Sequence, residues 1–261
     1  MDKASIVGVL LALSGIIAGL LIEGGNIGQI LQPTAALIVF GGTLGAVLLQ
    51  FPLSTVAAAF RRLAHVFAAP SRVNTLYIRQ LIDFAYKARR GGVVSLDSDL
   101  ESIRDPFMKQ AVMLAVDGTE PAELRRIMQV SLNCRTDVDD RMPAVFESAG
   151  GFSPTIGILG AVLGLIQVMG HLDNITEVGR GIAVAFVATI YGVGAANLFF
   201  LPAAGKLRLR LHEEHQRREM ILEGVISILE GMNPRMLEVK LSGFFERSNS
   251  EPETHIHERA A

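Results

Sequence analysis

Four apolar runs alternate with polar stretches along the chain of 261 residues. They cover about residues 6–22, 34–51, 152–170 and 181–203. Because a helix rises about 1.5 Å per residue, runs of this length can cross a hydrocarbon core of about 30 Å. We therefore predict an all-α membrane protein with four transmembrane helices, arranged as two hairpins.

The first apolar run could be mistaken for a secretory signal peptide, because only Lys3 precedes it among the basic residues. The run is longer than a usual signal core, and no small-x-small cleavage pattern follows it. A second apolar block comes soon afterwards. We interpret the run as a membrane span.

The polar chain around the hairpins is also predicted to be helical. Apolar positions recur at helical intervals in residues 76–85, 107–115 and 124–132, and alternating strand patterns are nearly absent. The predicted division is a hairpin over 1–52, a helical domain over 53–151, a second hairpin over 152–203 and a helical tail over 204–261. In the tail we expect a helix that breaks at Gly231, a short one over 234–245, and disorder from Ser248.

The Lys and Arg residues near the span ends indicate the orientation. They follow the second span, precede the third and follow the fourth: Arg61, Arg62, Arg72, Arg135, Arg141, Lys206, Arg208 and Arg210. The two short links carry only Arg180. The large loop, the tail and both termini are therefore predicted to be cytoplasmic.

Composition excludes several functions. A net charge of −2 and 50% hydrophobic residues argue against nucleic-acid binding, and a single cysteine, Cys134, permits no intrachain disulfide. The chain has no nucleophile elbow, phosphate loop or zinc-protease motif. The histidines at metal-like spacings are interpreted as solvated residues: His212, His215, His255 and His257. We expect no enzymatic activity, cofactor or metal.

The third and fourth runs contain no Asp, Glu, Lys, Arg or His. An ion path usually needs a charged or titratable group near the middle of the membrane, so a carboxylate would have to come from a partner helix. The polar or helix-bending candidates within the runs are Pro154, Thr155, Thr189 and Pro202. The alternative is structural, because prolines are common in membrane helices and a threonine hydroxyl often bonds to its own helix.

A basic and an acidic cluster flank Gly91 and Gly92 in the loop. The charged residues are Lys87, Arg89, Arg90, Asp97, Asp99 and Glu101. We expect the glycines to end one helix and Ser95 to cap the next, with the aspartates in its first turn. The functional interpretation is a bipolar docking surface, and the alternative is an ordinary solvated face.

Several segments, in this order, resemble the A subunit of the bacterial flagellar stator, the MotA/PomA family. They are residues 41–43 (GGT), 88–92 (ARRGG), 96–97 (LD), 105–107 (DPF), Pro154 with 157–165 (GILGAVLGL), 188–193 (ATIYGV), Asn197, Pro202, 218–224 (REMILEG) and 233–235 (NPR). The resemblance covers nearly the whole chain except the end of the tail.

This resemblance implies a ring of five A subunits around two copies of a MotB/PomB-like B subunit, whose single span bears the proton-accepting Asp. Ion flow along the third and fourth spans would turn the ring against the rotor switch protein FliG. By the same resemblance, Arg89 or Arg90 and Asp97 match the rotor-contacting charges, and Glu101 lies beside them. The family usually has Glu at the position of Asp97.

In the spans, the resemblance matches Pro154 and Pro202 with two functional prolines, and Thr189 with the hydroxyl beside the channel. Thr155 follows Pro154 as a further candidate. Ala161 occupies a position where sodium-driven members carry Thr, which favours H+ over Na+ as the transported ion. The resemblance places the protein in the bacterial inner membrane.

Two alternatives stay open. A related proton-channel subunit of the ExbB/TolQ type would energise outer-membrane transport, but such proteins typically have three spans and lack both the early hairpin and the ARRGG loop. A purely structural membrane scaffold is the other alternative.

Overall fold

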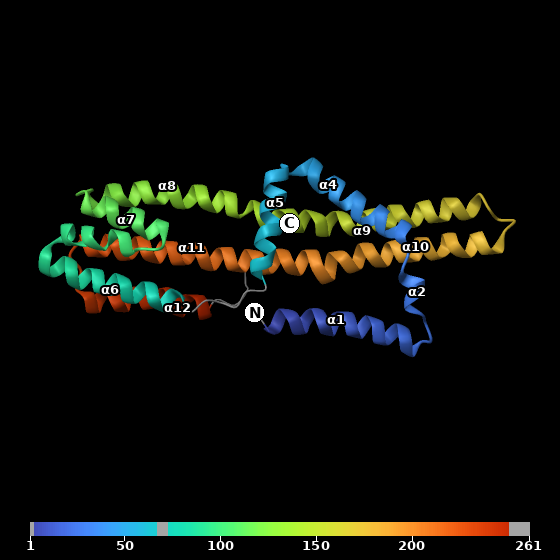
Figure 1. The fold of residues 1–261 in the computed structure, drawn as a ribbon, viewed down its shortest axis with the longest axis horizontal. Helices are drawn as coiled ribbons and strands as arrows, with labels where there is room; N and C mark the ends of the chain where they lie inside the picture. Colours follow the sequence, from blue (N-terminus) through green and yellow to red (C-terminus); the bar gives the residue numbers. More distant parts are fainter. Residues whose placement is uncertain (1–2, 67–72, 251–261) are drawn as a thin grey trace, which may run out of the picture. The chain divides into compact units, whose positions relative to one another are not determined.

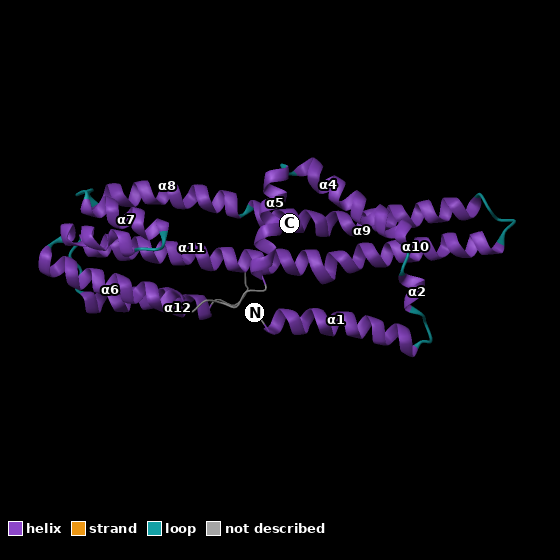
Figure 2. Ribbon diagram, viewed as in Figure 1, coloured by secondary structure: helices purple, strands orange, loops and turns teal. Residues whose placement is uncertain are grey.

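The computed structural model describes residues 3–66 and 73–250. Helices joined by short loops make up this part of the chain, with no strand in either range (Figure 2). The all-helical prediction is confirmed. Arg72, His255 and His257 lie outside the described residues, as does the predicted disorder of 251–261.

The chain forms two compact units. Unit 1 comprises residues 1–70 and 138–211, and unit 2 comprises residues 71–137 and 212–261. Two helices, α8 (Pro121–Asp139) and α11 (Leu201–Leu229), begin in one unit and end in the other. Figure 1 shows the order of the elements by colour.

Unit 1 holds the apolar helices. Its elements are α1 (Lys3–Ile22), α2 (Ile27–Ile30), α3 (Pro33–Ala36), the π-helical turn η1 (Leu37–Gly41), α4 (Gly42–Gln50), α5 (Leu53–Val66), α9 (Arg141–Met169), α10 (Ile175–Ala195) and the π-helical turn η3 (Ala196–Phe200). Helices α9 and α10 run side by side as an antiparallel pair (Figure 1).

Three helical stretches of the described residues are long and apolar enough to cross a membrane. They lie within Pro33–Gln50, Pro121–Met169 and Ile175–Leu229, and the apolar helix Val7–Ile22 is shorter. Length and composition thus identify three of the four predicted spans. The described apolar part of α1, Val7–Ile22, is shorter than the 18 residues required of the other three.

Polar side chains and glycines set the helix ends in unit 1. Gly24, with φ of +81°, follows the end of α1, and Asn26 caps α2 by accepting a hydrogen bond from the Gly28 amide at 2.9 Å. Asn174 caps α10 through a bond from the Thr176 amide at 3.1 Å. The two apolar hairpins therefore turn at residues suited to end one helix and start another.

Unit 2 is built around large buried side chains. Its elements are α6 (Val73–Gly91), the 3₁₀ segment η2 (Val93–Ser102), α7 (Pro106–Val116), α12 (Pro234–Ser250), most of α8 and the second part of α11. The core includes Leu81, Met108, Leu124, Met128 and Leu132, all fully buried. Burial of each such side chain contributes about 1.5–3 kcal/mol.

The helices predicted in the polar chain are confirmed, with two boundary differences. Helices α6, α7 and α8 cover the three predicted apolar repeats. Helix α12 continues from Pro234 to Ser250, so residues 248–250, predicted to be disordered, are helical. Helix α9 begins at Arg141, eleven residues before the apolar run, because Met142, Val145 and Phe146 already pack in a core.

Candidate functional site

The contact between α9 and α10 is made by small residues. A Cβ atom added to Gly157 would lie 2.9 Å from the Ala188 carbonyl oxygen, and one added to Gly164 would lie 2.8 Å from the Gly181 carbonyl oxygen. Only glycine allows backbones to approach this closely in a membrane helix pair. The two helices therefore form one tightly fitted unit with almost no space for larger side chains at the contact.

Ser153, near the start of the apolar run of α9, joins α9 to α10. Its fully buried hydroxyl donates to the Gly192 carbonyl oxygen of α10 at 3.0 Å. A Cβ added to Gly192 would come within 2.6 Å of the Ser153 carbonyl oxygen and 3.3 Å of the Pro154 Cα. Sequence reasoning missed Ser153, although a serine directly before a helix proline was available as a signal.

Pro154 lies within α9, where it removes a backbone donor from a helix that otherwise continues. Thr155 is exposed, and its hydroxyl donates to the Phe152 carbonyl oxygen at 2.8 Å. The bend-prone position is thus fixed to α10 through the Ser153–Gly192 bond, while Thr155 bonds within its own helix.

Thr189 lies on α10 and Ala161 on α9, and both are near the contact between these helices. The half-buried Thr189 hydroxyl donates to the Ala185 carbonyl oxygen at 3.2 Å, and the Thr189 Cα lies 3.5 Å from a Cβ added to Gly157. Ala161 is half-buried next to Gly160, which packs against Ala188. Thr189 and Pro154 therefore both lie at the α9–α10 contact. Thr189 lies beside Gly157, about one helical turn along α9 from Pro154.

Pro202 is exposed and lies two residues after the end of the π-helical turn η3. Its chain neighbour Leu201 lies close to Gly150 of α9, whereas Pro154 lies close to Gly192 of α10. In a π turn the amides bond to carbonyls five residues back, a pattern often found at functional sites. The two prolines therefore mark two separate places along the pair.

Tyr191 is a further residue that the site prediction left out. Its hydroxyl donates to the Ile30 carbonyl oxygen at 2.6 Å and accepts from the Gln32 amide at 3.4 Å. Tyr191 thereby bonds backbone groups of the link between α2 and α3, where the Gln32 amide also donates to the Ile30 carbonyl oxygen at 3.0 Å. A lone tyrosine in an apolar run was the available signal.

The charged cluster of unit 2 lies where α6 ends. Gly92, with φ of +78°, stops the helix, as predicted, and the 3₁₀ segment η2 follows. The prediction that Ser95 caps an α-helix is wrong. Gly92 takes the cap position, and the Ser95 hydroxyl donates to the Gly92 carbonyl oxygen at 2.6 Å. Leu96, 2% exposed, anchors η2 to the core.

One ion pair fixes this cluster. The Lys87 ammonium donates to the Asp99 carboxylate at 2.6 Å and to the Ser98 hydroxyl at 2.8 Å, which ties η2 to α6. The four predicted rotor-contacting side chains are exposed, and none forms an ion pair or hydrogen bond with the described part of the chain: Arg89, Arg90, Asp97 and Glu101. They remain available to an external partner.

A second charged group connects three helices of unit 2. Arg125 of α8 pairs with Glu223 of α11, which also accepts from Lys240 of α12 at 3.0 Å. Lys240 donates in addition to the buried Ser227 hydroxyl at 3.0 Å. The hydrogen bond from Arg125 holds the pKa of Glu223 below its ordinary range, against the opposing effect of burial.

Tyr77 forms a smaller cluster on α6. Its hydroxyl donates to the Asp105 carboxylate at 3.2 Å, and the Arg217 guanidinium carbon lies 5.6 Å from its ring centre. Burial, and then the charge of Asp105, raise the pKa of Tyr77. Asp105 also caps α7 by accepting from the Phe107 and Met108 amides. The cluster is structural.

The residues described here include no group of three His, Cys, Asp or Glu side chains that could hold a metal. His212 lies against Gln216, and His215 bonds Thr136 and Glu219. Within the part of the chain that the structure describes, these histidines are engaged in helix contacts.

Comparison with known proteins gives two family matches. Residues 99–220 match the MotA/TolQ/ExbB proton channel family, and residues 6–91 match the motility protein A N-terminal family. Motility protein A of Bacillus subtilis is 35% identical over 246 residues, which cover 92% of this chain and 90% of that protein.

Two solved structures are similar over the whole chain. The structure of C. jejuni MotAB superposes with a TM-score of 0.88 at 32% identity, covering 100% of this chain and 99% of that one. The flagellar MotAB stator complex from Bacillus subtilis gives a TM-score of 0.85 at 32% identity, covering 96% and 100%.

Proposed function

This chain belongs to the MotA/TolQ/ExbB proton channel family, and we propose that it is the A subunit of a flagellar motor stator. The observation that carries this function is the match, over the full chain, to solved MotAB complexes. The N-terminal match over residues 6–91 favours the motility branch of the family over the ExbB/TolQ branch. The partner is a B subunit of the MotB type, in the bacterial inner membrane.

We propose four spans, made by α1, by α3 to α4, by α9 and by α10. The large loop, the tail and both termini are cytoplasmic in this topology. The excess of Lys and Arg at one set of span ends supports it. So does the apolar character of α1, whose large side chains are exposed along its described length.

The ion path lies along α9 and α10 and is completed by the B subunit. No Asp, Glu, Lys, Arg or His occurs in residues 152–170 or 181–203, so the carboxylate that takes the ion comes from the partner. The ion is H+, which Ala161 favours. No cofactor takes part.

Arrival of the ion changes the shape of α9 at Pro154, and that of the chain that continues α10 through η3 into α11 at Pro202. Proline leaves a carbonyl of its helix without a partner, and this makes bending at that point less costly. The Ser153–Gly192 bond beside Pro154 supports a joint movement of the pair. Thr155 and Thr189 bond within their helices and hold the local geometry.

The exposed charges of unit 2 engage the rotor. Arg89, Arg90, Asp97 and Glu101 have no partner among the described residues, and the Lys87–Asp99 pair holds their supporting segment in place. A charged face of this kind steers and orients a partner of complementary charge. The partner is the switch protein FliG, and five A subunits form the ring that turns against it.

Complementation tests the proposal. Expression of the chain with its B subunit in a stator-null cell should restore swimming, and paralysis despite normal membrane insertion would overturn it. Replacing the membrane-spanning Asp of the B subunit with Asn should stop both ion flow and rotation, because this chain supplies no substitute carboxylate in residues 152–170 or 181–203.

Charge reversal separates rotor engagement from ion flow. Arg90→Glu should reduce torque severalfold and leave proton conduction at the level of the native complex, because the residue lies outside the spans. Arg90→Lys is the matched control and should swim nearly normally. Unchanged torque in the Glu variant would remove the docking role of this residue.

A further inference from the structure

A cavity of about 680 Å³ lies in unit 1 between α1, α4, α5, α9, α10 and η3. Figure 1 shows the helices that contribute to it. Its volume is in the range of about 300–1,000 Å³ that binds an organic ligand. A cavity of this size in a helical membrane unit therefore calls for an occupant.

The cavity wall is apolar. Among the described residues that line it, only Thr43 and Tyr191 have polar side chains. The Thr43 hydroxyl donates to the Val39 carbonyl oxygen at 2.6 Å, and the Tyr191 hydroxyl donates to the Ile30 carbonyl oxygen at 2.6 Å. Both hydroxyl protons are therefore already used. Apolar cavities of this kind exclude water and take hydrocarbon.

The walls do not close on each other. On α1, Val9 is 42% exposed, Leu13 47% and Ile16 51%, although all three line the cavity. On the opposite side, Ile190 is 50% exposed and Phe199 43%. Large apolar side chains thus face one another across a space that the described residues do not fill.

The occupant comes from outside the described residues. A slender, flexible hydrocarbon chain can follow an irregular apolar space of about 680 Å³.

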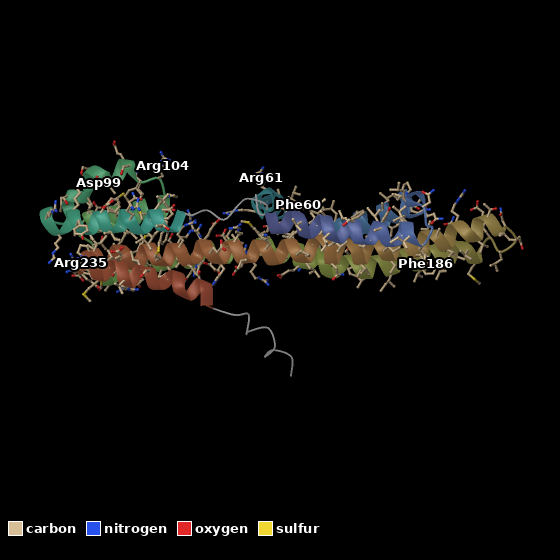
Figure 3. The ribbon with its side chains drawn as sticks, turned by 90° about the horizontal axis from the view of Figure 1, so that it is seen from below. Phe60, Arg61, Asp99, Arg104, Phe186 and Arg235 are labelled. Atoms are coloured by element: carbon tan, nitrogen blue, oxygen red, sulfur yellow. The ribbon has the colours of Figure 1, made fainter. Side chains whose placement is uncertain are left out.

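A positive charge lies one residue along the chain from the cavity wall. Phe60 of α5 lines it, and Arg61 is the next residue on the same helix (Figure 3). Arg61 is exposed and forms no ion pair or hydrogen bond with the described residues. The helix α5 comes directly after the span that ends at Phe51, at the level where phosphate headgroups lie in the proposed topology. An arginine there complements an anionic phosphate.

We infer that this cavity binds one acyl chain of an anionic phospholipid from the cytoplasmic leaflet, with its phosphate at Arg61. The lipid would fill the gap between α1 and the α9–α10 pair. The inference rests on the membrane location of unit 1 and is independent of rotor engagement.

The test is lipid retention by the purified complex of this chain with its B subunit. The complex is washed in detergent, and co-purifying phospholipids are quantified per A subunit by mass spectrometry. Gly194→Leu directs a side chain into the cavity from a glycine whose added Cβ meets nothing within 4 Å. It should lower retained phospholipid about tenfold.

Gly179→Leu is the matched control, since Gly179 also lies on α10 with open space around it and does not line the cavity. Its lipid content should equal that of the native complex. Ala12→Phe fills the cavity from the α1 side and should reproduce the loss, which guards against a folding defect in the first variant.

The headgroup is tested separately. Arg61→Gln should retain acyl lipid while losing the preference for phosphatidylglycerol and cardiolipin over phosphatidylethanolamine, and Arg61→Lys should keep it. Equal lipid content in the native and Gly194→Leu complexes would overturn the inference. So would a native complex without bound lipid, or density for a helix of a neighbouring copy in the cavity. A complex that inserts and binds lipid but does not restore swimming would count against the proposed function alone.

Discussion

The α9–α10 contact of unit 1 and the core of unit 2 hold helices together with opposite kinds of side chain. In unit 1 the contact is made by Gly157, Gly164 and Gly192, and large side chains such as Phe186 point outward, 70% exposed. In unit 2, Leu81 and Met108 are fully buried. Lipid is as apolar as leucine, so helices in it gain from close backbone contact, whereas helices in water gain from burying apolar area. The two sets of helices are therefore held together by different physical means.

The largest expected effect comes from filling the α9–α10 contact. Gly157→Leu adds a side chain where even its Cβ would lie 2.9 Å from the Ala188 carbonyl oxygen, so the helices must separate. We expect loss of swimming and of the assembled complex in size-exclusion chromatography. Gly151→Leu, on the same helix with open space around it, should assemble normally. Normal assembly of both variants would show that the close contact is dispensable.

The reverse experiment in unit 2 removes a large side chain. Leu124→Ala leaves a cavity in a fully buried position and should lower the free energy of unfolding of this unit by about 2–5 kcal/mol. Faster cleavage of the purified complex in limited proteolysis is the measurement. Leu76→Ala, at a position 64% exposed, is the control and should change the cleavage rate little.

A pH series tests the ion network of unit 2. The pKa of Glu223 is lowered by its hydrogen bond from Arg125. Its contribution to stability is therefore fully present above the ordinary value of 4.5 and is lost as pH falls through the lowered pKa. Glu223→Gln should lower the thermal midpoint at pH 7, and its difference from the native protein should shrink in acid.

The exposed Glu238 on α12 provides the control for this series. Glu238→Gln should leave the midpoint unchanged at both pH values. A difference between native and Glu223→Gln proteins that is constant with pH would contradict a charge-dependent role for Glu223.

The smallest effect is expected at Ser153. Ser153→Ala removes one buried hydrogen bond to Gly192 and should cost about 1 kcal/mol of stability, without disturbing the glycine contact. A small decrease in the thermal midpoint of the complex, with retained assembly, is the expected result. Ser153→Cys keeps a weak hydrogen-bond donor, so its thermal midpoint should lie between those of the native complex and the Ser153→Ala complex.

The sequence was sufficient for the helices and for their breaks. Apolar periodicity predicted α6, α7 and α8, and the Gly91–Gly92 pair predicted where α6 ends. It was not sufficient for the structure of residues 93–102. An α-helix capped by Ser95 and a 3₁₀ segment that begins after Gly92 satisfy the same local pattern, and burial of Leu96 decides between them.

The site residues were predicted unevenly for a related reason. Pro154 and Thr189 are conspicuous within apolar runs, and both lie at or beside the α9–α10 contact. Ser153 and Tyr191 owe their roles to partners 39 and 161 residues away, Gly192 and Ile30. Such pairings depend on which helices are neighbours, and local pattern does not reveal this.

The π-helical turn η3 changes the rotational phase of the helix in which it lies. Each residue of a regular helix advances by about 100°, and a turn with bonds to the fifth residue accommodates about one residue more than usual. The side chains of residues 201–211 therefore point in directions rotated by roughly a quarter of a turn about the helix axis. The reference is the direction that they would have if α10 continued as a regular α-helix. Deleting one residue from Ala196–Phe200 would remove the offset and rotate Ala203, Ala204 and Leu207 away from the neighbours that now bury them.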